Sequence, residues 1–236
     1  MSRPLTPTLS PSKGKRGKKV AGVLLAAGAS TRMGTDKLWA DLCGKPLISW
    51  PLQAFATSDA IDELIVAVSS ETIERMAHLI DELGIRARLV AGGARRQDSV
   101  RAALDVAADM EWVVVHDGAR PLLTAKLIED GLSAAAVTGA AIAAVPVVDT
   151  VKEVRDGAVL TTLERDALWA VQTPQVFRTS LLRAAHEASS VDVTDDAALV
   201  EALGTPVRVY MGAYENVKVT TPVDLHVAAC FIRDRV

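Results

Sequence analysis

The feature that most restricts the fold of this sequence is its alternation of short apolar runs with amphipathic segments. The runs VAGVLLA, WVVV and AAIAAVPVV are apolar at successive positions, as strands are when helices cover both faces of a parallel sheet. Strands that alternate with helices build βαβ units with right-handed crossovers. The sequence therefore predicts an α/β fold, a three-layer α/β/α sandwich with a mostly parallel, Rossmann-like sheet.

The expected elements follow one another regularly along the chain. We expect strands over residues 20–26, 64–68, 88–91, 112–115 and 141–147. We expect helices over residues 49–57, 71–83, 98–108, 124–137 and 179–189, and a further helix that opens at Thr194. The last helix has a clear start, because Thr221 suits the N-cap and Pro222 the first helical position, with Asp224 three residues after the cap.

The alternation stops after Pro146. The stretches VDTVKEV and VLTTLE are typical of two strands, and the Asp156-Gly157 pair between them is typical of a tight hairpin turn. We therefore expect a β-hairpin arm over about residues 147–165 that projects from the body. The residues leave open whether this arm mediates dimerisation or is a plain edge hairpin.

Residues 1–19 differ in composition from the rest of the chain. They hold six basic residues, no acidic residue and three prolines. Such a segment cannot bury enough apolar surface to offset the entropy lost on ordering. We expect a disordered basic tail over residues 1–19, either a solvated extension or a phosphate- or membrane-directed segment, and a single domain over residues 20–236.

Charge and cysteine content exclude several classes of protein. The 26 Lys and Arg residues face 29 Asp and Glu residues, so the net charge of −3 argues against nucleic acid as a partner. Cys43 and Cys230 lie far apart, which excludes a disulfide framework and a zinc site of thiolates. The apolar runs stop short of the roughly 18 residues that a membrane helix needs. We expect a cytoplasmic protein that binds no membrane.

The loop after the first expected strand has the composition of a phosphate-binding loop. It reads LLAAGASTRMGTDK from Leu24 to Lys37, and its small residues let backbone N–H groups approach phosphate oxygens closely. Arg32 and Lys37 add positive charge. The spacing excludes a Walker loop, and Ser30 stands where the dinucleotide pattern needs glycine. A tight turn with solvated charges remains the alternative.

Six segments carry a resemblance to a known family. AAGASTRMG followed by a lysine resembles the signature of nucleotidyltransferases of the sugar-nucleotide pyrophosphorylase type. It is followed in order by AGGARRQDSV, HDGARP, PVVDTVK, LWAVQTPQVF and ENVKVTTPVDL. Together these segments resemble the 2-C-methyl-D-erythritol 4-phosphate cytidylyltransferase family over nearly all of residues 20–232. The resemblance implies that a phosphate oxygen of methylerythritol phosphate attacks the α-phosphorus of CTP and releases pyrophosphate, in non-mevalonate isoprenoid precursor biosynthesis.

The resemblance implies a catalytic role for four cationic side chains. Arg32 would clamp the triphosphate, and Lys37 would stabilise the transition state at the α-phosphate. Lys218 would hold the attacking phosphate near the α-phosphorus. Arg165 would reach the substrate phosphate from the arm of the partner subunit, which implies a homodimer.

Further residues on the acceptor side follow from the same resemblance. Thr150 and Lys152 would belong to the wall that binds the polyol phosphate. Arg120 would contact this substrate or pair with its own loop. His116 reads as a packed, hydrogen-bonded histidine rather than a general base, and Thr173 would fix the backbone of the site.

The nucleotide side of the expected site combines backbone groups with one carboxylate. The resemblance places CTP against Ala26, Ala27, Gly28, Gly93 and the Ser99 hydroxyl. Asp117 would hold the Mg²⁺ ion that bridges the CTP phosphates, a task for hard oxygen ligands. Taken alone, Asp117 is a turn-stabilising aspartate and Ser99 a hydroxyl at a helix N-terminus. Arg96 would face the phosphates or its own loop.

Two other readings stay open. A relative that uses ribitol 5-phosphate is the first, because the two polyol phosphates differ mainly in the 2-methyl branch; a molybdopterin cytidylyltransferase fits DTVK, TPQ and ENVKVT less well. The second is a catalytically silent, nucleotide-binding regulatory module. A mere binder would not need the residues that hold an attacking phosphate, which favours an enzyme.

Overall fold

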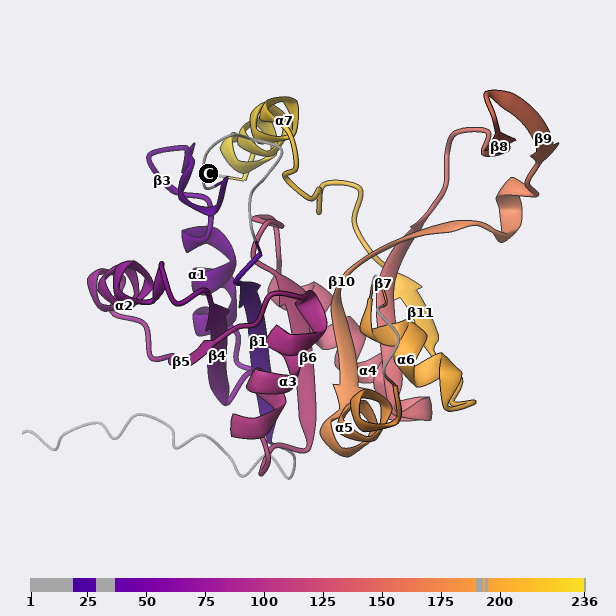
Figure 1. Ribbon diagram of the computed structural model, residues 1–236. Coiled ribbons are helices and arrows are strands. Elements are labelled where there is room, and N and C mark those ends of the chain that lie inside the picture. Colours follow the sequence, from indigo (N-terminus) through magenta and orange to yellow (C-terminus); the bar gives the residue numbers. More distant parts are fainter. Residues whose placement is uncertain (1–18, 29–36, 190–192, 194, 236) are drawn as a thin grey trace, which may run out of the picture.

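The computed structural model describes residues 19–28, 37–189, 193 and 195–235, so Arg32 and nearly all of the expected tail lie outside the described residues. Its central sheet has seven strands in the order β11-β7-β10-β6-β1-β4-β5 (Figure 1). Strand β10 runs antiparallel to both of its neighbours, and the other pairs are parallel. The strands are β1 (Val20–Ala26), β4 (Glu63–Val68), β5 (Arg88–Ala91), β6 (Trp112–Asp117), β7 (Ala140–Pro146), β10 (Trp169–Arg178) and β11 (Arg208–Met211).

Helices cover both faces of this sheet, which confirms the predicted three-layer sandwich. Strand β6 shows why residues 112–115 are all apolar. Val114 packs into one hydrophobic core, whereas Val113 and Val115 pack into the other, because successive side chains of a strand point to opposite faces. The helices are α1 (Ser49–Thr57), α2 (Ile73–Glu82), α3 (Arg96–Val106), α4 (Ala125–Thr138), α5 (Thr179–Ala188), α6 (Asp196–Ala202) and α7 (Pro222–Arg233).

The two cores belong to different helices. Side chains of α1, α2, α4 and α7 build the first core, in which Phe55 and Ile128 are fully buried. Side chains of α3, α5 and α6 build the second, around Leu104 and Leu182. Short elements complete the first layer, namely the 3₁₀ turn η1 (Lys37–Trp39) and the strand pair β2 (Asp41–Leu42) and β3 (Lys45–Pro46).

The start of α7 is as its sequence predicts. Thr221 is the N-cap and accepts a hydrogen bond from the backbone N–H of Asp224 at 3.3 Å. The Asp224 carboxylate accepts in return from the backbone N–H of Thr221 at 2.8 Å. Desolvation would raise the pKa of Asp224, but these hydrogen bonds and those from Thr220 together outweigh it and lower that pKa. The capping box fixes the chain directly after Lys218.

The expected β-hairpin arm is present. It consists of β8 (Lys152–Arg155) and β9 (Ala158–Thr162), which pair with each other in a sheet of their own and are exposed along their whole length. Asp156 and Gly157 have φ values of 51° and 78°, as the turn of a two-residue hairpin requires. In Figure 1 the arm extends away from the sheet, joined to it by β7 and β10.

Strands β10 and β11 are missing from the sequence-based prediction. Pro174 lies in the middle of β10, and proline normally argues against a central strand because it cannot donate to the ladder. The structure accommodates it with a register shift in the β10–β7 pairing between Val171 and Gln175.

No helix in the described part of the chain is long and apolar enough to span a membrane.

A close contact between β1 and α1 yields a stability prediction. A Cβ atom on Gly22 would lie 2.7 and 2.9 Å from two ring carbons of Phe55. We expect Gly22→Ala to lower the free energy of unfolding by about 1–3 kcal/mol, because overpacking forces the ring or the backbone to move. Urea unfolding measures this change. In the Phe55→Leu background the same substitution should cost less, and equal costs in both backgrounds would contradict the contact.

Candidate active site

The cavity expected of an α/β sheet lies at the carboxyl ends of β1 and β6. The chain leaves β1 towards β4 on one side, and β6 lies on the other, so this is the switch point where such sheets bind ligands. The cavity measures about 210 Å³. It is lined by Leu25, Ala27, Gly28, Lys37, Leu38, Gly93, Ala94, Arg95, Arg96, Ser99, Asp117, Gly118, Ala119 and Lys218.

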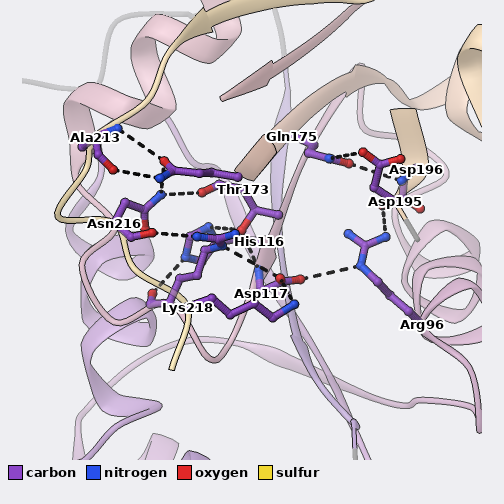
Figure 2. Close-up of polar contacts among 12 residues, drawn as sticks. Arg96, His116, Asp117, Thr173, Gln175, Asp195, Asp196, Ala213, Asn216 and Lys218 are labelled. Carbon is purple, nitrogen blue, oxygen red and sulfur yellow. Dashed lines mark hydrogen bonds and ion pairs between the residues drawn. The ribbon is translucent and has the colours of Figure 1, made fainter. Parts of the chain in front are cut away.

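Asp117, the last residue of β6, is the carboxylate on which the cations of the site converge (Figure 2). Its Oδ2 lies 2.8 Å from Nζ of Lys218, and its Oδ1 lies 3.6 Å from Nε of Arg96. Nε of Arg120 is 4.0 Å from Oδ2. Burial alone would raise the pKa of Asp117, but Arg96 and Lys218 outweigh it and hold that pKa well below its usual range. Asp117 is therefore an anion at every working pH.

Arg96 is held from its other side by a buried acid. Its Nη1 lies 2.5 Å from Oδ2 of Asp196, which is fully buried at the start of α6. Oδ1 of Asp196 is 3.1 Å from Nε2 of His186, a buried residue of α5. Burial would lower the pKa of Arg96, but Asp196 and Asp117 outweigh this and raise it. The sequence offered Arg96 only as a residue facing the phosphates or its loop, and it gave no sign of this pair.

The backbone on the nucleotide side is close-packed. A Cβ on Gly92 would lie 2.4 Å from Cβ of Ala27 and 2.7 Å from Oγ of Ser99, so only glycine lets these segments approach. Ser99 lines the cavity, and its hydroxyl donates to the carbonyl of Arg95 at 3.4 Å. Of the residues expected to contact CTP, Ala27, Gly28, Gly93, Ser99 and Asp117 line it. Ala26 ends β1 and is 6% exposed.

The expected catalytic cations divide into three groups. Lys37, in η1, and Lys218, before α7, line the same cavity although 181 positions separate them. Arg32 lies outside the described residues. Arg165 lies on the arm side, in the 3₁₀ turn η2 (Arg165–Ala167), where its Nη1 donates to the carbonyl of Val148 at 3.2 Å.

The residues expected on the acceptor side do not gather at the cavity of their own chain. Thr150, Lys152 and Arg165 are exposed on the arm and its base, and none lines the cavity. Arg120 does not line the cavity either; it is 9% exposed, and its Nη1 donates to the carbonyl of Asn216 at 2.7 Å. His116 is fully buried and hydrogen-bonded, as predicted.

Comparison with known proteins relates nearly the whole chain to one family. The model of the IspD family, 2-C-methyl-D-erythritol 4-phosphate cytidylyltransferase, matches residues 20–234. A curated protein of that name from Pelotomaculum thermopropionicum is 48% identical over 228 residues, which cover 92% of this chain and 95% of the relative. One from Dehalococcoides mccartyi is 44% identical over 220 residues, covering 92% of this chain and 97% of the relative.

Solved structures give the same result. The 4-diphosphocytidyl-2C-methyl-D-erythritol synthase of Anaerococcus prevotii matches with a TM-score of 0.82 and 28% identity, covering 92% of this chain and all of that chain. The 2-C-methyl-D-erythritol 4-phosphate cytidylyltransferase of Thermus thermophilus matches with a TM-score of 0.76 and 36% identity, covering 89% of this chain and 98% of that chain. Both the sequence and the fold are therefore similar to the same enzymes.

The buried partner of Arg96 gives a stability prediction. Asp196→Asn keeps the shape of the side chain but removes the closer of the two ion pairs that the structure describes for the largely buried Arg96 guanidinium, and the pair with Asp117 at 3.6 Å remains. We expect the free energy of unfolding to fall by about 3 kcal/mol. This value is at the lower end of the range for breaking a buried ion pair, because the Arg96 side chain is partly exposed. Denaturant unfolding measures it.

Asp130→Asn is the matched control. Asp130 pairs with Lys126 at 2.8 Å on the outer surface of α4, with both side chains well exposed. An exposed helical pair contributes about 0.3–0.5 kcal/mol, so this variant should stay close to wild type. Similar losses in the two variants would contradict the role given to Asp196.

Proposed function

The chain belongs to the 2-C-methyl-D-erythritol 4-phosphate cytidylyltransferase family, and we infer that it transfers the cytidylyl group of CTP to 2-C-methyl-D-erythritol 4-phosphate. An oxygen of the acceptor phosphate forms a bond to the α-phosphorus of CTP, and the bond to the leaving pyrophosphate breaks. The products are 4-diphosphocytidyl-2-C-methyl-D-erythritol and pyrophosphate, a step of non-mevalonate isoprenoid precursor biosynthesis. The protein is therefore a nucleotidyltransferase.

The observation that carries this function is the convergence of Lys37, Arg96 and Lys218 on one cavity at the strand ends. Two polyanions must meet there, and charge accumulates around a five-coordinate phosphorus. Fixed cations lower the barrier by positioning both phosphates and by stabilising that charge, without a protein nucleophile. We propose that Lys37 stabilises the α-phosphate in the transition state and that Arg32, from the same loop, clamps the triphosphate.

We propose that Lys218 holds the attacking phosphate. Its side chain is 44% exposed at the cavity while its ammonium group contacts Asp117, so it can reach a bound anion without a rearrangement of the backbone. Ala27, Gly28 and Gly93 would present backbone groups to the cytosine and ribose on the opposite side, with the Ser99 hydroxyl beside them. The acceptor and the nucleotide thus enter from different sides of Asp117.

We propose that the enzyme acts with Mg²⁺ and that Asp117 is its protein ligand. Within the described ranges, no group of three or more His, Cys, Asp or Glu side chains could hold a metal. Magnesium is commonly bound by one or two carboxylates together with substrate phosphates, and one ionised carboxylate at the cavity fits that arrangement. The ion would supply charge neutralisation along the triphosphate.

We propose that the active enzyme is a homodimer in which the arm completes the site of the partner. Arg165, Thr150 and Lys152 are exposed and lie away from the cavity of their own chain. The arm also exposes Val154, Val159 and Leu160, at 55%, 59% and 50%. If the arm packs these apolar side chains against a second copy of the chain, it would bring Arg165 to the acceptor phosphate in the site of that copy.

We further propose that the enzyme works in the cytoplasm. Cys43 and Cys230 are free thiols, and both are exposed. Exposed thiols persist in a reducing compartment, and CTP is made and used there.

A substrate panel tests the reaction itself. The protein is incubated with Mg²⁺, one of the four ribonucleoside triphosphates, and either methylerythritol phosphate or ribitol 5-phosphate, and pyrophosphate release is measured. We expect turnover with CTP and methylerythritol phosphate. A higher kcat/KM with ribitol 5-phosphate would assign the enzyme to that polyol instead, and binding of CTP without any turnover would make it a regulatory module.

Mixed dimers test the arm. Arg165→Ala and Lys218→Ala should each lose most turnover as homodimers, because each lacks one cation at the acceptor phosphate. Subunit exchange gives heterodimers of one Arg165→Ala subunit and one Lys218→Ala subunit. If Arg165 acts in its own chain, neither site of such a heterodimer keeps both cations. If Arg165 acts across the dimer, one of the two sites does. Random mixing should then restore about a quarter of wild-type activity. A mixture as inactive as its components would place Arg165 in the site of its own chain.

A further inference from the structure

Next to Asp117 and Lys218, buried side chains close a ring of hydrogen bonds that joins three separate segments (Figure 2). The segments are the end of β6 with the loop after it, the middle of β10, and the loop between β11 and α7. The exposed fraction of each member is below one tenth. The ring consists of Thr173, His116, Arg120 and Asn216.

The first half of the ring fixes the end of β6. The Thr173 hydroxyl accepts from the backbone N–H of Asp117 at 3.1 Å, and its own proton is donated to Nδ1 of His116 at 3.0 Å. Nε2 of His116 lies 3.1 Å from the carbonyl of Arg120, and it must donate because a carbonyl can only accept. A neutral imidazole, with Nε2 as donor and Nδ1 as acceptor, therefore matches both partners.

The second half fixes the loop that carries Lys218. Nη1 of Arg120 donates to the backbone carbonyl of Asn216 at 2.7 Å. Nδ2 of Asn216 donates to the backbone carbonyl of Thr173 at 2.7 Å, which closes the ring, and also lies 3.3 Å from Oε1 of Gln172. Gln172 holds the same loop further upstream, because its Nε2 donates to the carbonyl of Ala213 at 2.9 Å.

The ring members touch no part of the cavity, but their chain neighbours do. His116, Thr173, Asn216 and Arg120 are not among the residues that line it. Asp117 directly follows His116, and Lys218 comes two positions after Asn216. The ring therefore connects the backbone of Asp117 with the loop that carries Lys218.

We propose that His116, Thr173 and Asn216 are positioning residues for the transfer reaction, acting through the placement of Lys218 against Asp117. This inference rests on the proposed function, in which Lys218 holds the attacking phosphate. A displacement of about 1 Å in a reacting group can cost about a hundredfold in rate, so a small opening of the ring suffices. The competing explanation is that the ring only stabilises the fold.

Thr173→Val separates these explanations. Valine has nearly the same shape as threonine but lacks the hydroxyl that serves Asp117 and His116. We expect kcat to fall about tenfold or more, with the KM for CTP changed by less than about threefold, because the loss falls on the positioning of the acceptor. Thr173→Ser keeps the hydroxyl and should recover most of kcat.

Thr179→Val is the matched control. Thr179 is also buried, at 4% exposed, and it follows β10 at the start of α5, away from the cavity. Among the residues that the structure describes, its hydroxyl has no hydrogen-bond partner, so the same substitution removes no bond. We expect its kcat to equal that of wild type. A Thr173→Val enzyme that unfolds more easily but keeps its kcat, or a Thr173→Ser enzyme no better than valine, would overturn the proposal.

A double-mutant cycle tests whether the ring acts through Lys218. If it does, Thr173→Val should reduce kcat much less in the Lys218→Ala enzyme than in wild type, since the group to be positioned is already gone. Equal fold-losses in the two backgrounds would overturn this route.

The same cycle read in urea unfolding is independent of any substrate. Lys218→Ala should cost less stability in the Thr173→Val background, because an opened ring weakens the contact between Lys218 and Asp117. Costs that simply add would count against positioning. A wild-type enzyme that failed to use methylerythritol phosphate would overturn the proposed function, and this unfolding cycle would still decide the inference on the ring.

Discussion

The rest of the site depends on the contacts between the Asp117 carboxylate and the surrounding cations. A site for two phosphate compounds must gather cations, and two unit charges about 4 Å apart interact by about 4 kcal/mol at the effective dielectric of a protein surface. Asp117 offsets this repulsion by contacting Lys218, Arg96 and Arg120 at once. Because these cations come from three different segments, the same carboxylate also ties together the loops that form the cavity. The fold contributes by ending β6 at this point, next to the loop after β1.

Much of the fold could be predicted because parallel strands buried on both faces are apolar at every position. Strand β1 begins and ends where its sequence predicts, and the hairpin turns at Asp156 and Gly157 as expected. Strand β10 could not be recognised, because Pro174 interrupts its pattern and because an antiparallel strand inside a parallel sheet depends on the final packing. Local sequence carries no information about such pairing.

The site was predictable only where motif residues face the cavity themselves. Ala27 and Lys37 belong to a loop whose composition already indicated phosphate binding, whereas Asp117 and Lys218 were identified through the family resemblance. The cavity brings all four together. The support behind them could not be predicted. Asp196 contacts Arg96 across 100 positions of sequence, and nothing in the TDDAAL stretch indicates that partner. The closed hydrogen-bond ring likewise exists only after β6, β10 and the loop before α7 have met.

Strand β10 has a consequence for how the arm can change over evolution or in engineering. The strand runs from Trp169, at the return of the arm, through Thr173 to Arg178 at the far end of the sheet. A length change at the Asp156-Gly157 tip would leave its register intact. One residue inserted between Trp169 and Thr173 would turn every following side chain to the opposite face, and the Thr173 hydroxyl would lose its hydrogen bonds to Asp117 and His116. The arm can therefore be lengthened or shortened at its Asp156-Gly157 tip, but not between Trp169 and Thr173.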